Sequence, residues 1–259
     1  MKILNHEIDL QDFFLKVHAG ASLLMLDYDG TLAPFVKERM RAHLYTGVKD
    51  RLIAIAGLKK IRTVIVSGRS LSELETLLDL SPLIELWGSH GCERMLPDGT
   101  IINAKIEAKL VEGLGKGTQA CKTNVGSEWC EVKPYSVALH WRGMDPKERI
   151  RAKDIIEKLW LEICERYALE IHPFEGGMEL RLKGWNKGNV VQELLKEIPE
   201  GLPIAYLGDD LTDEDAFKTL GNKGLKVLVR MQPRETLADI LLIPPHELLS
   251  FLDLWVKNV

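Results

Sequence analysis

The sequence predicts an α/β fold: a parallel sheet with helices on both faces, interrupted by an inserted α+β domain. Two short apolar runs, residues 22–26 and 63–66, are typical of strands buried in a parallel sheet. A stretch with helical apolar spacing follows each run, which is the order of elements in such a fold. Near Pro97-Asp98-Gly99 this alternation is lost, and it returns only at Asn186.

The first part of the chain is predicted to alternate helices with strands. Ser70 or Ser72 is expected to cap a helix whose apolar stripe consists of leucines, at 71, 74, 77 and 78. In chain order, the predicted elements fall at residues 8–18, 22–26, 46–58, 63–66, 71–78 and 84–87. The last of these strands is closed by a Gly88-Ser89-His90-Gly91 turn.

The middle of the chain, residues 97–182, is predicted to form the inserted domain. Residues 131–142 and 169–182 alternate as half-buried strands do, and a long helix over 146–167 lies between them. The apolar side of that helix carries Ile150, Ile155, Ile156, Leu159, Trp160 and Ile163. Residues 1–96 and 183–259 are assigned to the α/β domain, with later elements at 187–198, 204–207 and 226–229 and an amphipathic segment around Leu248–Trp255.

Composition narrows the class of protein. The 259 residues are 46% hydrophobic and carry a net charge of −4, which gives no reason to expect nucleic acid or an anionic membrane as a partner. The four cysteines show no C-x-x-C pair or metal-ligand spacing, so reduced thiols are expected. No leader segment and no run long enough to span a bilayer is seen, and we therefore expect a soluble, cytoplasmic protein.

Two clusters of carboxylates follow predicted core strands. Asp27 and Asp29 come directly after residues 22–26, and Asp209, Asp210 and Asp213 come after residues 204–207. A D-x-D-G segment alone is equally typical of a strand followed by an Asp-Gly turn. Two such clusters at strand ends repel each other unless a cation lies between them. The pair therefore predicts a magnesium site at the carboxyl edge of the sheet.

Two further segments stand between these clusters in the sequence. Ser67-Gly68-Arg69 ends the strand 63–66, and Lys187 begins a predicted helix. Taken alone, Ser67 is more typical of a strand-end turn and Lys187 of a surface lysine. Their order relative to the two acidic clusters is what favours a functional role, with Ser67 and nearby amides holding phosphoryl oxygens and Lys187 adding a positive charge.

With these four segments in this order, the sequence resembles the haloacid dehalogenase superfamily of phosphohydrolases over nearly its whole length. The string GDDLTDEDAF at residues 208–217, with SGR and NKG, resembles the trehalose-6-phosphate phosphatase branch. The resemblance implies a HAD-like core with a C2-type cap, Mg²⁺ as cofactor, and hydrolysis of trehalose 6-phosphate in trehalose biosynthesis. A sugar phosphate is then the expected partner, with functional coupling to a trehalose-6-phosphate synthase as a further expectation.

The chemistry assigns a role to each core residue. Asp27 is the expected nucleophile and Asp29 the expected general acid and base. Magnesium would be held by Asp27, the Asp29 carbonyl and Asp209. Asp210 and Asp213 are expected to bind metal waters or to orient Lys187. The catalytic set is thus Asp27, Asp29, Ser67 and Lys187.

The inserted domain is expected to select the substrate. Glu131 and Lys133 share one strand face, and His140 with Arg142 repeats the spacing. Such charged donors and acceptors suit a polyhydroxylated sugar, although each residue alone is more typical of a solvated strand face. The E-x-K pair and a later Glu179 resemble the sugar-gripping set of the family's cap. The full set of expected substrate-binding residues is Ser67, Gly68, Arg69, His90, Glu131, Lys133, His140, Arg142 and Glu179.

Two alternatives stay open at this point. One is a phosphatase of the same superfamily acting on glucosylglycerol phosphate, mannosyl-phosphoglycerate or sucrose phosphate, since the core motifs recognise only the phosphate. The other is a non-catalytic partner of a sugar-phosphate synthase. Such a partner is expected to have lost Asp27, Asp29 or Lys187, and all three are present.

Overall fold

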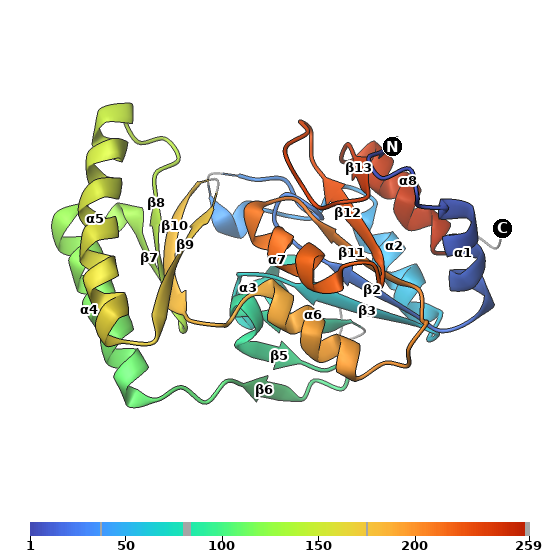
Figure 1. Ribbon diagram of the computed structural model, residues 1–259, viewed down its shortest axis with the longest axis horizontal. Helices are drawn as coiled ribbons and strands as arrows, with labels where there is room; N and C mark the ends of the chain where they lie inside the picture. The colour runs from blue at the N-terminus through green and yellow to red at the C-terminus, as the bar shows by residue number, and fades with distance from the viewer. Residues whose placement is uncertain (37, 80–83, 175, 257–259) are drawn as a thin grey trace. The chain divides into compact units, whose positions relative to one another are not determined.

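The computed structural model describes residues 1–36, 38–79, 84–174 and 176–256. The chain divides into two compact units, which are treated separately below. Unit 1 comprises Met1–Ile102 and Asn186–Val259, and unit 2 comprises Asn103–Trp185 (Figure 1). Unit 1 keeps residues 97–102, which the sequence assigns to the insert, because strand β6 (Ile101–Asn103) completes the edge of its sheet.

Unit 1 is built on one nine-stranded sheet in the order β1-β13-β12-β11-β2-β3-β4-β5-β6. The strands from β13 to β4 run parallel, while β1 and β5 are antiparallel additions. The other bounds are Lys2–Ile3 (β1), Ser22–Leu26 (β2), Ile61–Val66 (β3), Glu85–Gly88 (β4), Glu93–Met95 (β5), Ile204–Gly208 (β11), Leu225–Val229 (β12) and Ile240–Leu242 (β13).

Helices cover both faces of this sheet because its central strands are apolar on both sides. Along β2, Leu24 and Leu26 face one core and Leu23 and Met25 face the other, as alternation along a strand requires. The first core is closed by α1 (Leu10–Ala19), α2 (Val48–Gly57), α3 (Leu71–Leu78) and α8 (His246–Leu254). The second is closed by α6 (Lys187–Lys196) and α7 (Leu211–Leu220), drawn in orange in Figure 1.

The direction of winding changes between β2 and β11. From β2 the chain proceeds through β3 to β4, whereas from β11 it proceeds the other way to β12 and β13. The register places Leu207 opposite Leu26, which in turn lies opposite Ile65. In open α/β sheets the crevice beyond such a reversal is where ligands bind. The segments after β2, β3 and β11 are those that carry the predicted motifs.

Helix α3 shows how local sequence sets an element boundary. Ser70 is the N-cap, and it forms a capping box in which the Ser70 hydroxyl accepts from the Glu73 N–H and Glu73 accepts from the Ser70 N–H. This decides between the two serines that the sequence offers. Its four stripe leucines are all buried, as predicted.

Unit 2 is a four-stranded antiparallel sheet in the order β7-β8-β10-β9, with two helices on one of its faces (Figure 1). Each stretch that alternates in the sequence folds as two strands and not as one. The bounds are Cys130–Val132 (β7), Ser136–His140 (β8), Leu169–Phe174 (β9) and Gly177–Leu182 (β10), with α4 at Ala108–Asn124 and α5 at Pro146–Arg166. Residue 175, inside the predicted range 169–182, lies outside the described residues.

Helix α5 agrees with the predicted range, but its predicted apolar side is only partly buried, because Ile155, Leu159 and Ile163 are half-buried and Ile150 is exposed. Ile156 and Trp160 are fully buried against the sheet and α4. Ile150 remains 63% exposed because it lies at the start of the helix, on the wall of an open cavity.

Two global observations complete the fold. No helix in the described part of the chain is long and apolar enough to cross a membrane. None of the four cysteines, all of which lie in the described part of the chain, forms a disulfide, in agreement with the reduced thiols expected from the sequence.

Candidate active site

Asp27 lies at the carboxyl end of β2 with its side chain almost fully buried. Its N–H donates to the Leu207 carbonyl at 2.8 Å, which ties the residue to the neighbouring strand β11. One carboxylate oxygen accepts a hydrogen bond from Lys187 Nζ at 2.6 Å, and the other accepts from the Thr31 hydroxyl at 3.2 Å. Lys187 is the first residue of α6, so the structure brings together two residues 160 positions apart.

Asp213, in the first turn of α7, holds Lys187 in place. Its Oδ1 accepts from Lys187 Nζ at 2.8 Å and from the Tyr206 hydroxyl at 2.7 Å. Its Oδ2 accepts from the N–H groups of Asp209 and Asp210 at 3.1 and 3.0 Å. Four donors therefore use both oxygens, and Asp213 orients Lys187 and the motif turn. Tyr206 was not foreseen, although a tyrosine inside a core strand needs a partner for its hydroxyl.

The charges around Asp27 do not balance within the described residues. Burial raises the pKa of Asp27 to about 7, against the lowering effect of Lys187. Burial disfavours the charged form of Lys187, but the carboxylates of Asp213 and Asp27 outweigh it and hold its pKa above the ordinary value. Burial and the carboxylates of Asp27 and Asp213 raise the pKa of Asp209 well above its usual range. One ammonium thus faces three buried carboxylates.

The residues present fit a divalent cation at this point. Asp27, Asp209 and Asp213 each offer an oxygen within 4.8 Å of the others. Asp213 is saturated by its four donors, whereas no hydrogen bond or ion pair reaches the Asp209 carboxylate within the described residues. Gly30, with φ of +82°, lets that carboxylate pack against the β2 turn, since a Cβ there would collide with Asp209 Oδ2. Hard carboxylate oxygens are the ligands that Mg²⁺ prefers.

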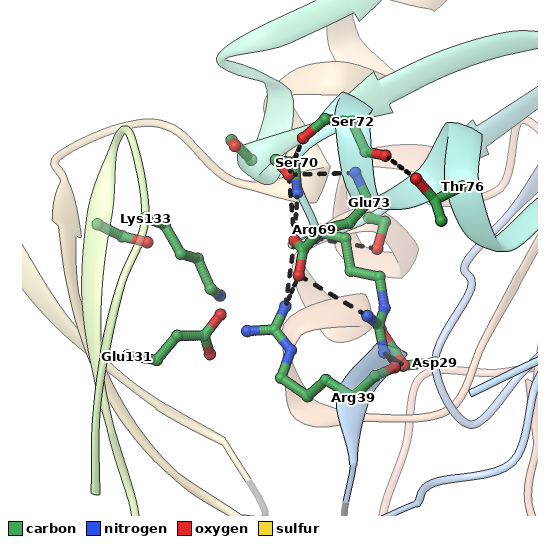
Figure 2. A network of polar contacts seen from close by, with 12 residues as sticks. Asp29, Arg39, Arg69, Ser70, Ser72, Glu73, Thr76, Glu131 and Lys133 are labelled. Carbon is green, nitrogen blue, oxygen red and sulfur yellow. Dashed lines mark hydrogen bonds and ion pairs between the residues drawn. The ribbon is translucent and has the colours of Figure 1, made fainter. Parts of the chain in front are cut away.

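Asp29 is held by an arginine fork. Arg69 donates from Nε to Asp29 Oδ2 at 2.7 Å and from Nη2 to Oδ1 at 2.6 Å, while Nη2 also reaches the Arg39 carbonyl at 3.0 Å (Figure 2). The Arg69 guanidinium lies over the Tyr28 ring at 5.5 Å and is nearly buried. In unit 1, therefore, Arg69 contacts the expected acid and base directly, whereas the sequence suggested a contact with substrate.

The turns after β3 and β4 are joined around Ser67. The Ser67 hydroxyl accepts from the Arg69 N–H at 3.2 Å, and the Ser67 carbonyl accepts from the His90 N–H at 3.0 Å. Gly68 lies directly against the His90 ring, so closely that a Cβ at this position would be 2.6 Å from His90 Nε2. Ser67, Gly68 and His90 thus form one buried corner of unit 1.

Arg234 is a contributor that sequence reasoning missed. It donates from Nη2 to the Asp210 carbonyl at 2.8 Å and from Nε to the Asp209 carbonyl at 3.4 Å, and it forms an ion pair with Glu214. The residue fixes the turn that presents Asp209. It follows β12, and no spacing to the motifs could have identified it.

The expected sugar-binding residues of unit 2 lie mainly on one face of its sheet. Lys133 Nζ pairs with Glu179 Oε1 at 2.8 Å, and His140 Nε2 pairs with Glu131 Oε2 at 2.6 Å. Figure 2 shows the side chains of Glu131, on β7, and of Lys133, just after β7, side by side. Ser136, which was not foreseen, donates to the same Glu179 oxygen at 2.7 Å. Arg142 lies beyond the end of β8, where its guanidinium packs against Gly176.

Comparison with known proteins points to one family. Residues 25–239 match the model of the trehalose-phosphatase family. A relative described as probable trehalose-phosphate phosphatase G, from Arabidopsis thaliana, is 31% identical over 90% of this chain and 68% of its own length. The solved C-terminal domain of the Candida albicans trehalose-6-phosphate phosphatase covers 97% of this chain and 98% of that one, with 23% identity and a TM-score of 0.81.

The same fold also occurs in a protein described by a regulatory role. The C-terminal domain of a Candida albicans trehalose synthase regulatory protein superposes with a TM-score of 0.70 at 13% identity, covering 95% of this chain and 98% of that one. Fold likeness at this identity shows the fold alone, so the choice between catalyst and regulator rests on the site residues.

Proposed function

The chain belongs to the trehalose-phosphatase family, and from this premise we propose that it is a magnesium-dependent phosphatase that hydrolyses trehalose 6-phosphate to trehalose and phosphate. It has the haloacid dehalogenase fold that its motifs predict. The observation that carries the proposal is a buried Asp27 paired with Lys187 and placed beside a second buried carboxylate, Asp209. This is the arrangement that a carboxylate nucleophile needs if it is to approach a phosphate dianion.

Asp27 attacks phosphorus in the first step. A bond forms between an Asp27 oxygen and phosphorus while the bond from phosphorus to the sugar oxygen breaks, giving an aspartyl-phosphate. Water then displaces the Asp27 oxygen and releases phosphate. Lys187, fixed at 2.6 Å from Asp27 by Asp213, supplies a positive charge that does not have to reorganise during either displacement. Phosphate monoesters hydrolyse so slowly unaided that such a site must supply roughly 20 kcal/mol.

Asp29 moves the protons. In the first step its carboxyl donates a proton to the leaving sugar oxygen, and in the second its carboxylate takes a proton from the attacking water. Both Asp29 oxygens accept from Arg69 in the resting structure. A protonated Asp29 needs one of those oxygens for its own O–H, so at least one guanidinium bond must loosen as the proton is taken up.

Asp27, Asp209 and the Asp29 carbonyl are the proposed magnesium ligands. When bound, the ion neutralises the phosphoryl oxygens and the adjacent carboxylates. This accounts for the excess of buried negative charge around Asp27, which Lys187 alone does not offset.

Unit 2 is proposed to recognise the sugar. On one sheet face, Lys133 forms an ion pair with Glu179 and His140 is hydrogen-bonded to Glu131. These four side chains would exchange these bonds for sugar hydroxyls. We further infer that a trehalose-6-phosphate synthase supplies the substrate, because glycosyl transfer to a sugar phosphate gives a phosphorylated disaccharide directly.

A phosphate-release assay across a panel of sugar phosphates tests the proposal. With magnesium, trehalose 6-phosphate should give the highest kcat/KM, above sucrose phosphate, glucosylglycerol phosphate and mannosyl-phosphoglycerate. A different preferred substrate would replace the assignment within the same chemistry. No turnover of any member by folded, magnesium-loaded protein would instead favour the regulatory alternative, despite the presence of Asp27, Asp29 and Lys187.

A further inference from the structure

A cavity of about 620 Å³ lies within unit 2, where the chain leaves β8 and enters α5. Its wall includes Trp141, Met144, Arg149, Ile150 and Lys153. The volume is in the range of sites that hold small molecules, which is roughly 300–1,000 Å³. None of these five residues belongs to the proposed phosphatase site.

Apart from Arg142, which lines the cavity from beyond the end of β8, the cavity is separate from the polar face that carries Glu131, Lys133, His140 and Glu179. Side chains alternate along β8, so Trp141 follows His140 on the opposite side of the sheet. The Arg149 guanidinium confirms this placement, since it lies 5.1 Å from the centre of the Trp141 ring and belongs to α5, one of the helices that cover that opposite face.

The charge on the wall is one-sided. Arg142, Arg149 and Lys153 line the cavity, and no carboxylate does so within the described residues. Arg149 and Lys153 are one helical turn apart, where like charges repel each other. Within the same described residues, neither has an acidic partner. The chain as a whole has a net charge of −4, so the positive charge of this wall does not follow from the overall composition. A wall of this charge favours binding of an anion.

The rest of the wall is apolar. Ile150 is 63% exposed here, and Trp141 and Met144 extend the same apolar surface. The Trp141 side chain is itself 7% exposed, and its indole N–H is buried without an acceptor in the described part of the chain. A ligand with an apolar body would pack against these side chains, and a hydrogen-bond acceptor on the ligand would accept from the Trp141 indole N–H.

We propose that this cavity binds a small organic phosphate, with its dianionic group on Arg149 and Lys153 and its apolar or aromatic body against Trp141 and Ile150. The guanidinium fork and the ammonium suit phosphoryl oxygens. More than one unpaired cation favours a dianion over a monoanion.

Titration of the full chain with phenylphosphonate, which cannot be hydrolysed as an ester, tests this site. The readout is the indole ¹⁵N–¹H spectrum without added magnesium, in which the Trp141 signal is assigned by its loss in Trp141→Phe. We expect a saturable shift of the Trp141 signal. The double variant Arg149→Gln/Lys153→Gln should bind roughly a hundredfold more weakly, at about tenfold for each charged contact.

A matched double variant, Lys147→Gln/Lys158→Gln, removes the same charge from α5 outside the cavity wall and should bind phenylphosphonate as the wild type does. Unchanged signals from the other tryptophans will show that each variant is folded. Benzoate, a monoanion of similar shape, should bind more weakly than phenylphosphonate.

Several outcomes would overturn the proposal. They are the absence of a saturable Trp141 shift up to about 10 mM probe, equal weakening in the two double variants, or equal affinity for benzoate. Phosphatase turnover of the Arg149→Gln/Lys153→Gln variant, measured separately, should equal that of the wild type. The result for the cavity is therefore independent of the result for the proposed function.

Discussion

Asp27 combines burial, a fixed ammonium partner and a position at the reversal point of the sheet. Burial alone would favour a neutral carboxyl, and its pKa is indeed raised to about 7. Lys187 opposes this effect at 2.6 Å, and Asp213 keeps Lys187 from moving away. The residue therefore remains available as a carboxylate only through its surroundings, which is the condition expected of a nucleophile.

Asp27→Asn should abolish turnover with little change in fold, because the amide is isosteric but cannot attack phosphorus. Phosphate release from trehalose 6-phosphate measures the loss, and circular dichroism checks the fold. In the wild type, beryllofluoride should attach to Asp27. More than trace activity in a clean Asp27→Asn preparation would exclude the covalent route.

The raised pKa of Asp27 predicts that the stability of the metal-free protein depends on pH. The pKa of Asp27 is raised on folding, so its favourable contribution is complete below about 4 and is lost as the pH rises through about 7. Asp209 acts in the same direction. Thermal unfolding should therefore show that added magnesium raises Tm more at pH 8 than at pH 5.5.

The Asp27→Asn variant is the control for the predicted pH dependence of stability. Without metal at pH 8 it should raise Tm above that of the wild type, because it removes a buried charge for which desolvation outweighs the attraction of Lys187. A lower Tm for the variant would mean that the ion pair, and not burial, governs this site.

At the scale of residues, the sequence predicted the site residues that belong to charged motifs directly after core strands or at the start of a helix. Asp27, Lys187 and Asp213 meet as their order along the chain suggests. Tyr206 and Arg234 were missed because their contacts depend on which strand lies beside which. The engagement of Arg69 with Asp29 depends on the path of the β3–α3 turn, which no motif encodes.

At the scale of elements, α4 is the clearest case of structure that the sequence pattern concealed. Glycines at 113, 115 and 117 lower the helix propensity of this segment, so it was not predicted as a helix. Two of them are buried for packing: Gly113 lies against Tyr167, and Gly117 lies against Leu180 and Val137 of the sheet. The Gly117 carbonyl also accepts from the Trp160 indole at 3.1 Å. Tertiary packing thus overrides propensity.

Two substitutions in α4 separate packing from propensity. Gly117→Ala should destabilise unit 2 by roughly 1–3 kcal/mol, because its Cβ would collide with the Leu180 side chain in the closed core. Gly115→Ala, exposed on the same helix with nothing within 4 Å of its Cβ, should instead stabilise by roughly 0.5–1 kcal/mol. Urea unfolding measures both, and a shift of the same sign in the two variants would contradict this account.

The strands of unit 2 show a related limit of what the sequence pattern can predict. The stretches 131–142 and 169–182 alternate as predicted, but each bends into a hairpin, at Lys133–Tyr135 in the first case. Period-two alternation reports which face a residue occupies and says little about where a strand turns. The buried parallel strands were easier to place because turn residues bound each apolar run.

At the scale of the whole molecule, chemistry and recognition are assigned to different units. Unit 1 holds every proposed reacting group, and unit 2 holds the polar face with Glu131, Lys133 and Glu179. Because the proposed reacting groups of unit 1 act on the phosphate and the oxygen that bridges it to the sugar, we expect unit 2 to recognise the rest of the sugar. Binding energy from the sugar is then available to order the reacting groups.

The last prediction tests this division. Glu179→Gln removes the charge from a nearly buried carboxylate that accepts from both Lys133 and Ser136. If these groups grip sugar hydroxyls, kcat/KM for trehalose 6-phosphate should fall by about ten- to a hundredfold, equivalent to roughly 1.5–3 kcal/mol. The loss should be much smaller with p-nitrophenyl phosphate, which offers no hydroxyls. Glu162→Gln, an exposed change on α5, is the matched control and should alter neither value. Equal losses on both substrates would assign Glu179 to the stability of unit 2, since a fold defect lowers every activity alike whereas a lost sugar contact lowers only one.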